Sequence, residues 1–405
     1  MAYSYADQGE RTRVLKDVRR VVLKVGTRLL TDMPDVPKAE RVTQLVDAIA
    51  ALHDRGYEVI LVSSGAIGAG MTVLQTPKRP HSLPQLQAHA AVGQSRLMYL
   101  YETAAARHGF HCAQLLLTAA DVKDRVRHLN VVNCLDALLA AGVLPVVNEN
   151  DSVSVEEIRF GDNDALAALV ASMIRADLTV LLTSVDGMHE RTDRGWGRRM
   201  SVVPGITTAI RQMAGGTDGN RFSTGGMQSK LQAVEIVTRA GEPAVIADGR
   251  DFATLAGVFD GRDCGTLFLP TASQRMRARK RYLAFFSKTK GDILVDAGAE
   301  SALTQKGRSL LPSGIVAVRE TFERGDTVRI LSVEGIEIAR GESNYGSAEV
   351  DAIKGCKSQT VRDILGYEGY DAVVHRDAMV LTGTPSGEAQ DEPRRPKPEA
   401  KHGTE

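Results

Sequence analysis

The segment NENDSVSVEEIRFGDND, residues 148–164, holds the densest group of side chains that could do chemistry. Amides and carboxylates gather at its two ends, NEND and GDND, the second of which opens a helical pattern. One Asx side chain is enough to cap a helix, so capping by Asp162, Asn163 or Asp164 would account for only part of the segment. We favour a polar small-molecule site here, with helix capping as the alternative.

A second segment, TGGMQSK at residues 224–230, could bind phosphate. Two glycines let backbone N–H groups approach a ligand, the segment leads into a helical pattern, and Lys230 adds a full positive charge. The pattern alone is not specific. Neither a Walker GxxxxGK[ST] motif nor a protein-kinase HRD and DFG pair occurs, which excludes the two commonest ATP-using designs at the motif level.

Lys24 and the small-residue segment SSGAIGAG, residues 63–70, complete the candidates. Lys24 ends an apolar run before Gly26, and because an unpaired buried ammonium is costly it must meet an anion or extend into water. The segment 63–70 allows close backbone approach to a small ligand, or merely tight packing of a strand against a helix. Both alternatives stay open at this point.

These segments need elements that position them. Short apolar runs alternate with amphipathic stretches from residue 20 onward, which predicts strands at 20–25, 58–62, 114–117, 143–147, 179–182 and 244–247 and helices near 42–52, 129–141, 163–176 and 227–240. Repeated strand–helix–strand units predict an α/β fold, a three-layer αβα sandwich with a mainly parallel central sheet. Ligands bind beyond the carboxyl ends of such strands, where residues 24–27, 63–70, 148–151 and 183–187 fall.

Composition excludes several classes of protein. The 405 residues are 43% hydrophobic and 25% charged, and 50 basic side chains balance 50 acidic ones, so nothing pulls the chain as a whole toward nucleic acid or anionic membrane. No apolar stretch approaches the ~20 residues of a membrane span, and the first 20 residues lack a signal-peptide core. Four dispersed cysteines and nine scattered histidines favour neither disulfides nor a protein-held metal. We expect a cytoplasmic protein.

The composition and the hydrophobic pattern of the sequence change after residue 270. A basic run, residues 274–282, precedes short alternating segments separated by glycine turns, which predicts a small β-rich domain. We place the first domain at 18–272, the second at 278–382 and a polar, proline-rich disordered tail at 383–405.

Taken in order, these segments resemble the amino-acid kinase family. The matching segments are VLKVGT at 22–27, VSSGAIGAG at 62–70, AAVGQSRLM at 90–98, LLLTAAD at 115–121, NENDSV, GDND and TGGMQSK. GTLFLP at 265–270, SLLPSGI at 309–315, ILGYE at 364–368 and VVHRDAMVL at 373–381 resemble the PUA domain that follows the kinase domain in bacterial members acting on glutamate. The likeness covers residues 18–382.

The resemblance implies transfer of the γ-phosphoryl group of ATP to the side-chain carboxylate of L-glutamate, the first step of proline synthesis. It implies that Lys24 and Lys230 contact the transferring group, that Asp164 holds both ammonium groups, and that glutamate is bound by Ser64, Asp151 and Asn163. The residue types suit this chemistry, because a carboxylate acceptor is already ionised at neutral pH and needs no protein base.

The resemblance also implies the nucleotide contacts. These are Lys24, Thr183, Ser184, Thr224, Gly225, Gly226, Met227, Gln228, Ser229 and Lys230, with Mg²⁺ bridging the phosphates and few protein ligands to the metal. The sequence departs from the family pattern at Ser184, where aspartate is common, and at Ser223, which replaces a glycine.

Partners are implied in the same way: feedback inhibition by proline through residues 152–160, a homo-oligomer (dimer or tetramer), and glutamyl phosphate reductase as consumer of the product. Two alternatives remain. The PUA-like domain could bind RNA through Arg275, Arg277, Arg279, Lys280 and Arg281, although we favour a solvated linker there and expect no RNA partner. The activity could also be that of an acetylglutamate or uridylate kinase, but an acetylated substrate has no ammonium to pair with Asp151.

Overall fold

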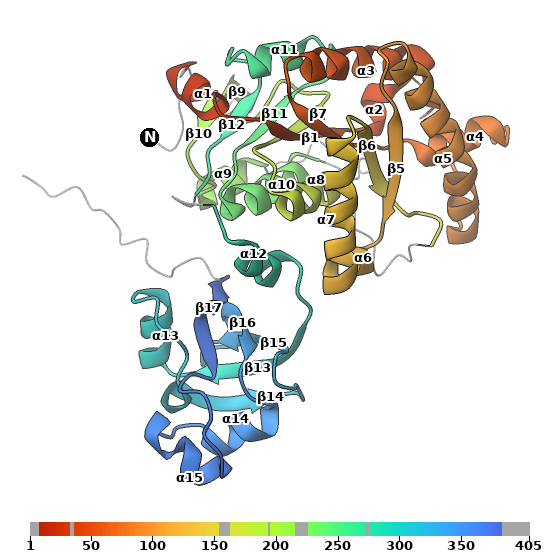
Figure 1. Cartoon of the computed structure of the whole chain (residues 1–405). Helices are drawn as coiled ribbons and strands as arrows, with labels where there is room; N and C mark the ends of the chain where they lie inside the picture. Colours follow the sequence, from red (N-terminus) through yellow and green to blue (C-terminus); the bar gives the residue numbers. More distant parts are fainter. Residues whose placement is uncertain are drawn as a thin grey trace, which may run out of the picture. The chain divides into compact units, whose positions relative to one another are not determined.

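In the computed structural model, the run RVVLKV forms strand β1 (Arg20–Val25) in the middle of a parallel sheet (Figure 1). The structure describes residues 8–32, 36–153, 163–192, 195–214, 226–271 and 275–382. Contacts divide the chain between Ser287 and Lys288 into two compact units. The predicted tail, 383–405, lies outside the described residues.

Eight strands form the central sheet within the described part of the first unit. In sheet order they are β10 (Val202–Val203), β12 (Thr266–Phe268), β11 (Ala244–Asp248), β7 (Leu178–Thr183), β1, β4 (Glu58–Val62), β6 (Leu144–Glu149) and β5 (Cys112–Leu117). The strands from β11 to β5 run parallel, whereas β12 is antiparallel to β11. The prediction of a mainly parallel sheet is confirmed, and the edge pair β12 and β10 adds two strands that hydrophobic runs did not reveal.

Alternation along β1 assigns its side chains to two cores. Val21, Leu23 and Val25 belong to a core with α3 (Ala39–Asp54), α5 (Leu83–Ala106) and α11 (Thr254–Phe259). Val22 belongs to the core on the other face, with α7 (Arg125–Ala140), α8 (Asn163–Ile174) and α10 (Met227–Ala240). Because side chains alternate along a strand, Lys24 points to the same face as Val22, toward α8 and α10. The predicted three-layer sandwich is confirmed.

Glycines in the segment 63–70 serve packing as well as turning. Gly65, with φ of 102°, lies at the start of α4 (Ala66–Val73), in a conformation that favours glycine. A Cβ on Gly70 would lie 1.9 Å from the carbonyl O of His89, and one on Gly93 would lie 1.7 Å from that of Ala66. Close packing of α4 on α5 therefore explains Gly70, while Ser63 and Ser64 remain at the end of β4.

The remaining elements of the first unit are short. They are α1 (Gln8–Leu15), α2 (Thr27–Leu30), β2 (Thr31–Asp32), β3 (Val36–Pro37), α6 (Ala119–Lys123), β8 (His189–Thr192), β9 (Gly195–Arg199), α9 (Thr208–Ala214) and α12 (Ala278–Phe285). The predicted second domain starts at residue 278, yet Phe286, just after α12, belongs to the core around α8 and α10. Within the described residues, no helix is long and apolar enough to span a membrane.

The second unit is built on a five-stranded sheet. Its strands, in sheet order, are β14 (Ile315–Arg319), β13 (Thr289–Val295), β15 (Thr327–Leu331), β16 (Glu337–Ser343) and β17 (Val374–Leu381). Its helices are α13 (Ala297–Thr304), α14 (Ser347–Ile353) and α15 (Val361–Leu365), with short 3₁₀ turns at Pro312–Gly314 and Ser358–Thr360. This unit has its own apolar core around Phe322 and Tyr345, which confirms the strand-rich second domain.

Candidate active site

Two lysines from distant parts of the chain meet on one buried carboxylate. Lys24 Nζ lies 2.6 Å from Asp164 Oδ1, and Lys230 Nζ lies 2.9 Å from Asp164 Oδ2. Lys24 is 4% exposed, Lys230 6% and Asp164 0%, so water screens these charges little. The alternative in which Lys24 extends into solvent is wrong.

The elements explain this meeting. Lys24 lies near the carboxyl end of β1, Asp164 is the second residue of α8, and Lys230 lies in the first turn of α10. Both helices begin at the same edge of the sheet and pack side by side (Figure 1). Ser229, beside Lys230, adds a hydrogen bond from its Oγ to Asp164 Oδ2 at 3.2 Å.

The charges leave this cluster positive. Burial alone would raise the pKa of Asp164, but the ammonium groups of Lys24 and Lys230 outweigh burial and lower that pKa below its ordinary value. The aspartate is therefore ionised, and the sum over these three side chains, two ammonium groups and one carboxylate, is one positive charge. The amino-terminal ends of α8 and α10 add N–H donors and positive dipole ends. Such a cluster is suited to an anion.

A polar network adjoins the lysine cluster through the neighbouring residue, Asn163. Its Nδ2 lies 2.5 Å from the carbonyl O of Ser63, 2.7 Å from Ser64 Oγ and 3.0 Å from Asn148 Oδ1. The network joins the carboxyl ends of β4 and β6 to the start of α8. Asn148 is itself buried inside β6, which extends to Glu149, two residues beyond the predicted strand.

Sequence reasoning missed one member of this network. The Oη of Tyr101, on α5, lies 2.6 Å from Ser63 Oγ, and burial raises the pKa of this tyrosine, which keeps it neutral. Nothing in the pattern of α5 separates Tyr101 from an ordinary core residue; only the packing of α5 against the end of β4 does. Asp151, predicted to bind glutamate, lies half-buried in the turn after β6.

The model of the amino acid kinase family matches residues 19–248, which include Lys24, Asp164 and Lys230. The chain belongs to the amino acid kinase family. A model of the PUA domain matches residues 291–365, inside the second unit.

Individual members of the amino acid kinase family match most of the chain. Glutamate 5-kinase from Trichlorobacter lovleyi is 46% identical over 373 residues, which cover 92% of this chain and 99% of that protein. Glutamate 5-kinase from Caldanaerobacter subterraneus subsp. tengcongensis is 46% identical over 364 residues, covering 89% and 97%. Among solved structures, carbamate kinase from Giardia lamblia bound to AMP-PNP is 19% identical with a TM-score of 0.46, covering 62% of this chain and 99% of that one.

The structure describes most of the residues that are predicted to contact the nucleotide in this amino acid kinase. Thr183 ends β7, Ser184 is exposed beside it, and Met227, Gln228, Ser229 and Lys230 form the first turn of α10. A Cβ placed on Gly226, before that turn, would meet no atom of the described residues within 4 Å. Thr224 and Gly225 lie outside the described residues, as does most of the predicted proline-responsive segment, residues 154–160.

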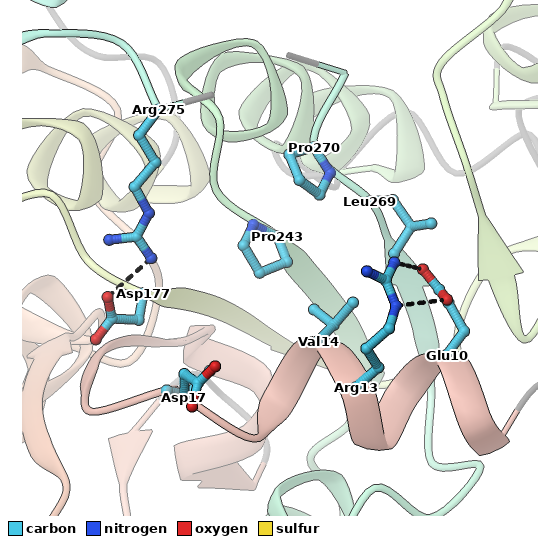
Figure 2. A pocket seen from close by; sticks show the side chains of 10 residues that line it. Glu10, Arg13, Val14, Asp17, Asp177, Pro243, Leu269, Pro270 and Arg275 are labelled. Carbon is cyan, nitrogen blue, oxygen red and sulfur yellow. Dashed lines mark hydrogen bonds and ion pairs between the residues drawn. The ribbon is translucent and has the colours of Figure 1, made fainter. Parts of the chain in front are cut away.

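A cavity of about 420 Å³ lies at the opposite edge of the sheet, where β7 and β11 begin (Figure 2). Two arginines line it, and both already have anionic partners: Arg13 pairs with Glu10, and Arg275 with Asp177. Lys24, Asp164 and Lys230 do not line this cavity, so it is separate from the lysine cluster.

Proposed function

We propose that this amino acid kinase transfers the γ-phosphoryl group of ATP to the side-chain carboxylate of L-glutamate, forming L-glutamyl 5-phosphate. This reaction opens proline biosynthesis from glutamate. The main structural support is that Lys24 and Lys230 both pair with buried Asp164 at the carboxyl edge of the sheet. The names of relatives that match 92% of the chain support the same activity.

The lysines provide the charge that this reaction needs. Negative charge spreads over the phosphoryl oxygens as the group passes between two anionic partners, so catalysis is positioning and charge neutralisation. In the proposal, Lys24 and Lys230 contact the group in transit, and Asp164 keeps each ammonium in place. The acceptor carboxylate needs no base, since its ordinary pKa lies near 4.3.

Glutamate and ATP are proposed to approach from the two sides of this cluster. Asn163 and Ser64 would donate to the carboxylates of glutamate, and Asp151 would accept from its ammonium. ATP phosphates would lie at the start of α10, over the residues from Gly226 to Lys230, with Thr183 and Ser184 toward the nucleoside. Thr224 and Gly225 stay part of the proposed phosphate loop.

Mg²⁺ is proposed to accompany ATP. The ion would be held chiefly by nucleotide oxygens and water. Within the described residues, no group of three histidine, cysteine or carboxylate side chains could hold a metal by itself. The metal would neutralise phosphate charge in addition to the charge that Lys24 and Lys230 neutralise.

Further proposals follow from the same resemblance. They are a homo-oligomer (dimer or tetramer), inhibition by proline through residues 152–160, use of the product by glutamyl phosphate reductase, a cytoplasmic location and no RNA partner.

A substrate panel tests the activity directly. ADP release is measured with L-glutamate, N-acetyl-L-glutamate, L-aspartate and UMP, each with and without proline, and the acyl phosphate is trapped with hydroxylamine. We expect turnover with glutamate and a hydroxamate product. Activity with acetylglutamate or UMP alone would overturn the assignment.

A further inference from the structure

Arg281 is the buried arginine of the basic run 274–282, and it binds where two helices of the site end. Its Nη1 donates to the carbonyl O of Ser172 at 3.1 Å, and its Nη2 donates to that of Ala240 at 3.2 Å. Ser172 lies in the last turn of α8, and Ala240 is the last residue of α10. One side chain therefore caps both helices.

The chemistry of this contact is specific to arginine. Carbonyl groups in the last turn of a helix lack partners within the helix and carry partial negative charge. A planar guanidinium with five N–H donors in fixed directions can serve two such carbonyls at once, which an ammonium on a flexible stem does less well. Glu242, 2% exposed, accepts from Nη2 at 2.5 Å and holds the guanidinium in this orientation.

The segment that contains Arg281 makes further contacts near the carboxyl ends of α8 and α10. Arg275 pairs with Asp177, between α8 and β7, at 2.8 Å, as Figure 2 shows. The N–H of Met276 donates to the carbonyl O of Ala240 at 2.9 Å. The run is thus neither a solvated linker throughout nor a free row of cations, since Arg275 and Arg281 are both engaged.

The helices that Arg281 joins carry the two halves of the site at their other ends. Asn163 and Asp164 lie at the start of α8, and Ser229 and Lys230 lie at the start of α10. A helix has a fixed rise per residue, so an axial shift at one end appears at the other. Joining the two carboxyl ends therefore fixes the axial register of the two amino ends.

We propose that Arg281 is a positioning residue for phosphoryl transfer, because it sets the register between the helix that orients glutamate and the helix that binds ATP phosphates. The inference rests on the proposed function. The residue acts through Asn163, Asp164 and Lys230 and touches no substrate. It lies on α12, the last helix before the second unit begins at Lys288.

The test compares Arg281→Met and Arg281→Lys with two control variants of the full chain. Arg277→Met removes an exposed arginine just before the same helix. Arg11→Met removes a fully buried arginine that donates to the carbonyls of Ser201 and Gly265, neither of which belongs to α8 or α10. Turnover per folded enzyme, the KM of each substrate and the Kd of a non-hydrolysable ATP analogue are measured for all four.

We expect Arg281→Met to lower kcat per folded enzyme by about tenfold or more, since a displacement near 1 Å can cost about a hundredfold. KM and Kd should change within about twofold, because each ligand keeps its own helix, and Arg281→Lys should fall between wild type and Met. Both controls should keep the wild-type kcat. A kcat within twofold of wild type for Arg281→Met, or an equal loss in Arg11→Met, would show that Arg281 only supports the fold.

A second readout does not need glutamate turnover. Hydrogen exchange of peptides covering residues 163–168 and 227–231 should quicken in Arg281→Met and not in Arg11→Met. Unchanged exchange there would overturn the positioning role, whereas a wild-type chain inactive on glutamate would overturn the proposed function instead.

Discussion

Asn163 and Asp164 are neighbours at the start of α8, yet their side chains belong to two different networks. Asn163 contacts Ser64 Oγ at 2.7 Å, whereas Asp164 pairs with Lys24 at 2.6 Å and with Lys230 at 2.9 Å. One helix terminus thus fixes a neutral donor group and a positive cluster relative to each other. In the proposed reaction, the first would orient the acceptor and the second would neutralise the group that moves.

Replacing a lysine of the cluster should mainly lower turnover. We expect Lys24→Met or Lys230→Met to reduce kcat about a hundredfold or more, as removal of one preorganised donor to a transition state does. Steady-state kinetics with glutamate and ATP check this, with exposed Lys16→Met as the control. Near-normal kcat in Lys230→Met would remove the lysine from the proposed mechanism.

Changing the neighbouring network should mainly alter substrate affinity. Hydrogen bonds to charged groups contribute about 1.5–3 kcal/mol, so Asn163→Ala should raise the KM for glutamate at least about tenfold, with a smaller effect on the KM for ATP. Ser64→Ala should act in the same direction more weakly. The ratio of the two KM values separates this result from a general loss of active enzyme, which would leave both unchanged.

Asp177 should contribute a pH-dependent part of stability. Burial alone would raise its pKa, but the backbone N–H groups of Arg20 and Arg19 and the Arg275 guanidinium hold it below the ordinary value. A carboxyl with a lowered pKa in the folded state stabilises above its ordinary pKa, near 3.9, and loses that contribution as pH falls below it.

We therefore expect Asp177→Asn to lower the free energy of unfolding by about 1 kcal/mol at pH 7, a modest effect because the pair is partly exposed. At pH 3 the effect of the substitution should be smaller, because the ionic contribution of Asp177 is already partly lost there. Urea unfolding at both pH values measures the difference. An equal effect of the substitution at the two pH values would contradict the ionic role of Asp177.

Backbone conformation offers a prediction that involves no contact. Gln75, exposed after α4, has a φ of 52°, in the left-handed region that costs an L-residue about 1–2 kcal/mol. Gln75→Gly should raise the free energy of unfolding by up to about 1 kcal/mol, less than the strain because glycine is freer when unfolded.

Gly109 is the matched opposite case. Its φ is 76°, and a Cβ there would meet no atom of the part of the chain that the structure describes within 4 Å. Gly109→Ala should therefore destabilise by about 1 kcal/mol through backbone conformation. Thermal unfolding of the two variants should move Tm in opposite directions. A fall in Tm for Gln75→Gly would mean that its side chain stabilises more than the backbone strain costs.

Local pattern and spacing were sufficient to predict several features of this chain. Apolar runs and amphipathic stretches predicted the parallel sheet and its helical layers, because a two-residue and a 3.6-residue period are properties of the chain itself. The helix expected at residues 227–240 spans Met227–Ala240, whereas α7 begins at Arg125, capped by Asp124, before the apolar pattern from residue 129 reveals it. Motif order predicted the family, and the edge strands β10 and β12 were too short to predict.

Only the tertiary structure decided which side chains meet. Lys24, Asp164 and Lys230 meet because side chains alternate along β1 and because α8 and α10 begin at the same edge of the sheet. These residues are far apart in the sequence, so no local periodicity predicts that they meet. Tyr101 and Arg281 look like an ordinary core residue and an ordinary cation in the sequence. Their partners, Ser63 and the carbonyls of Ser172 and Ala240, are chosen by packing between distant elements, because hydrogen bonds depend on positions in space rather than along the chain.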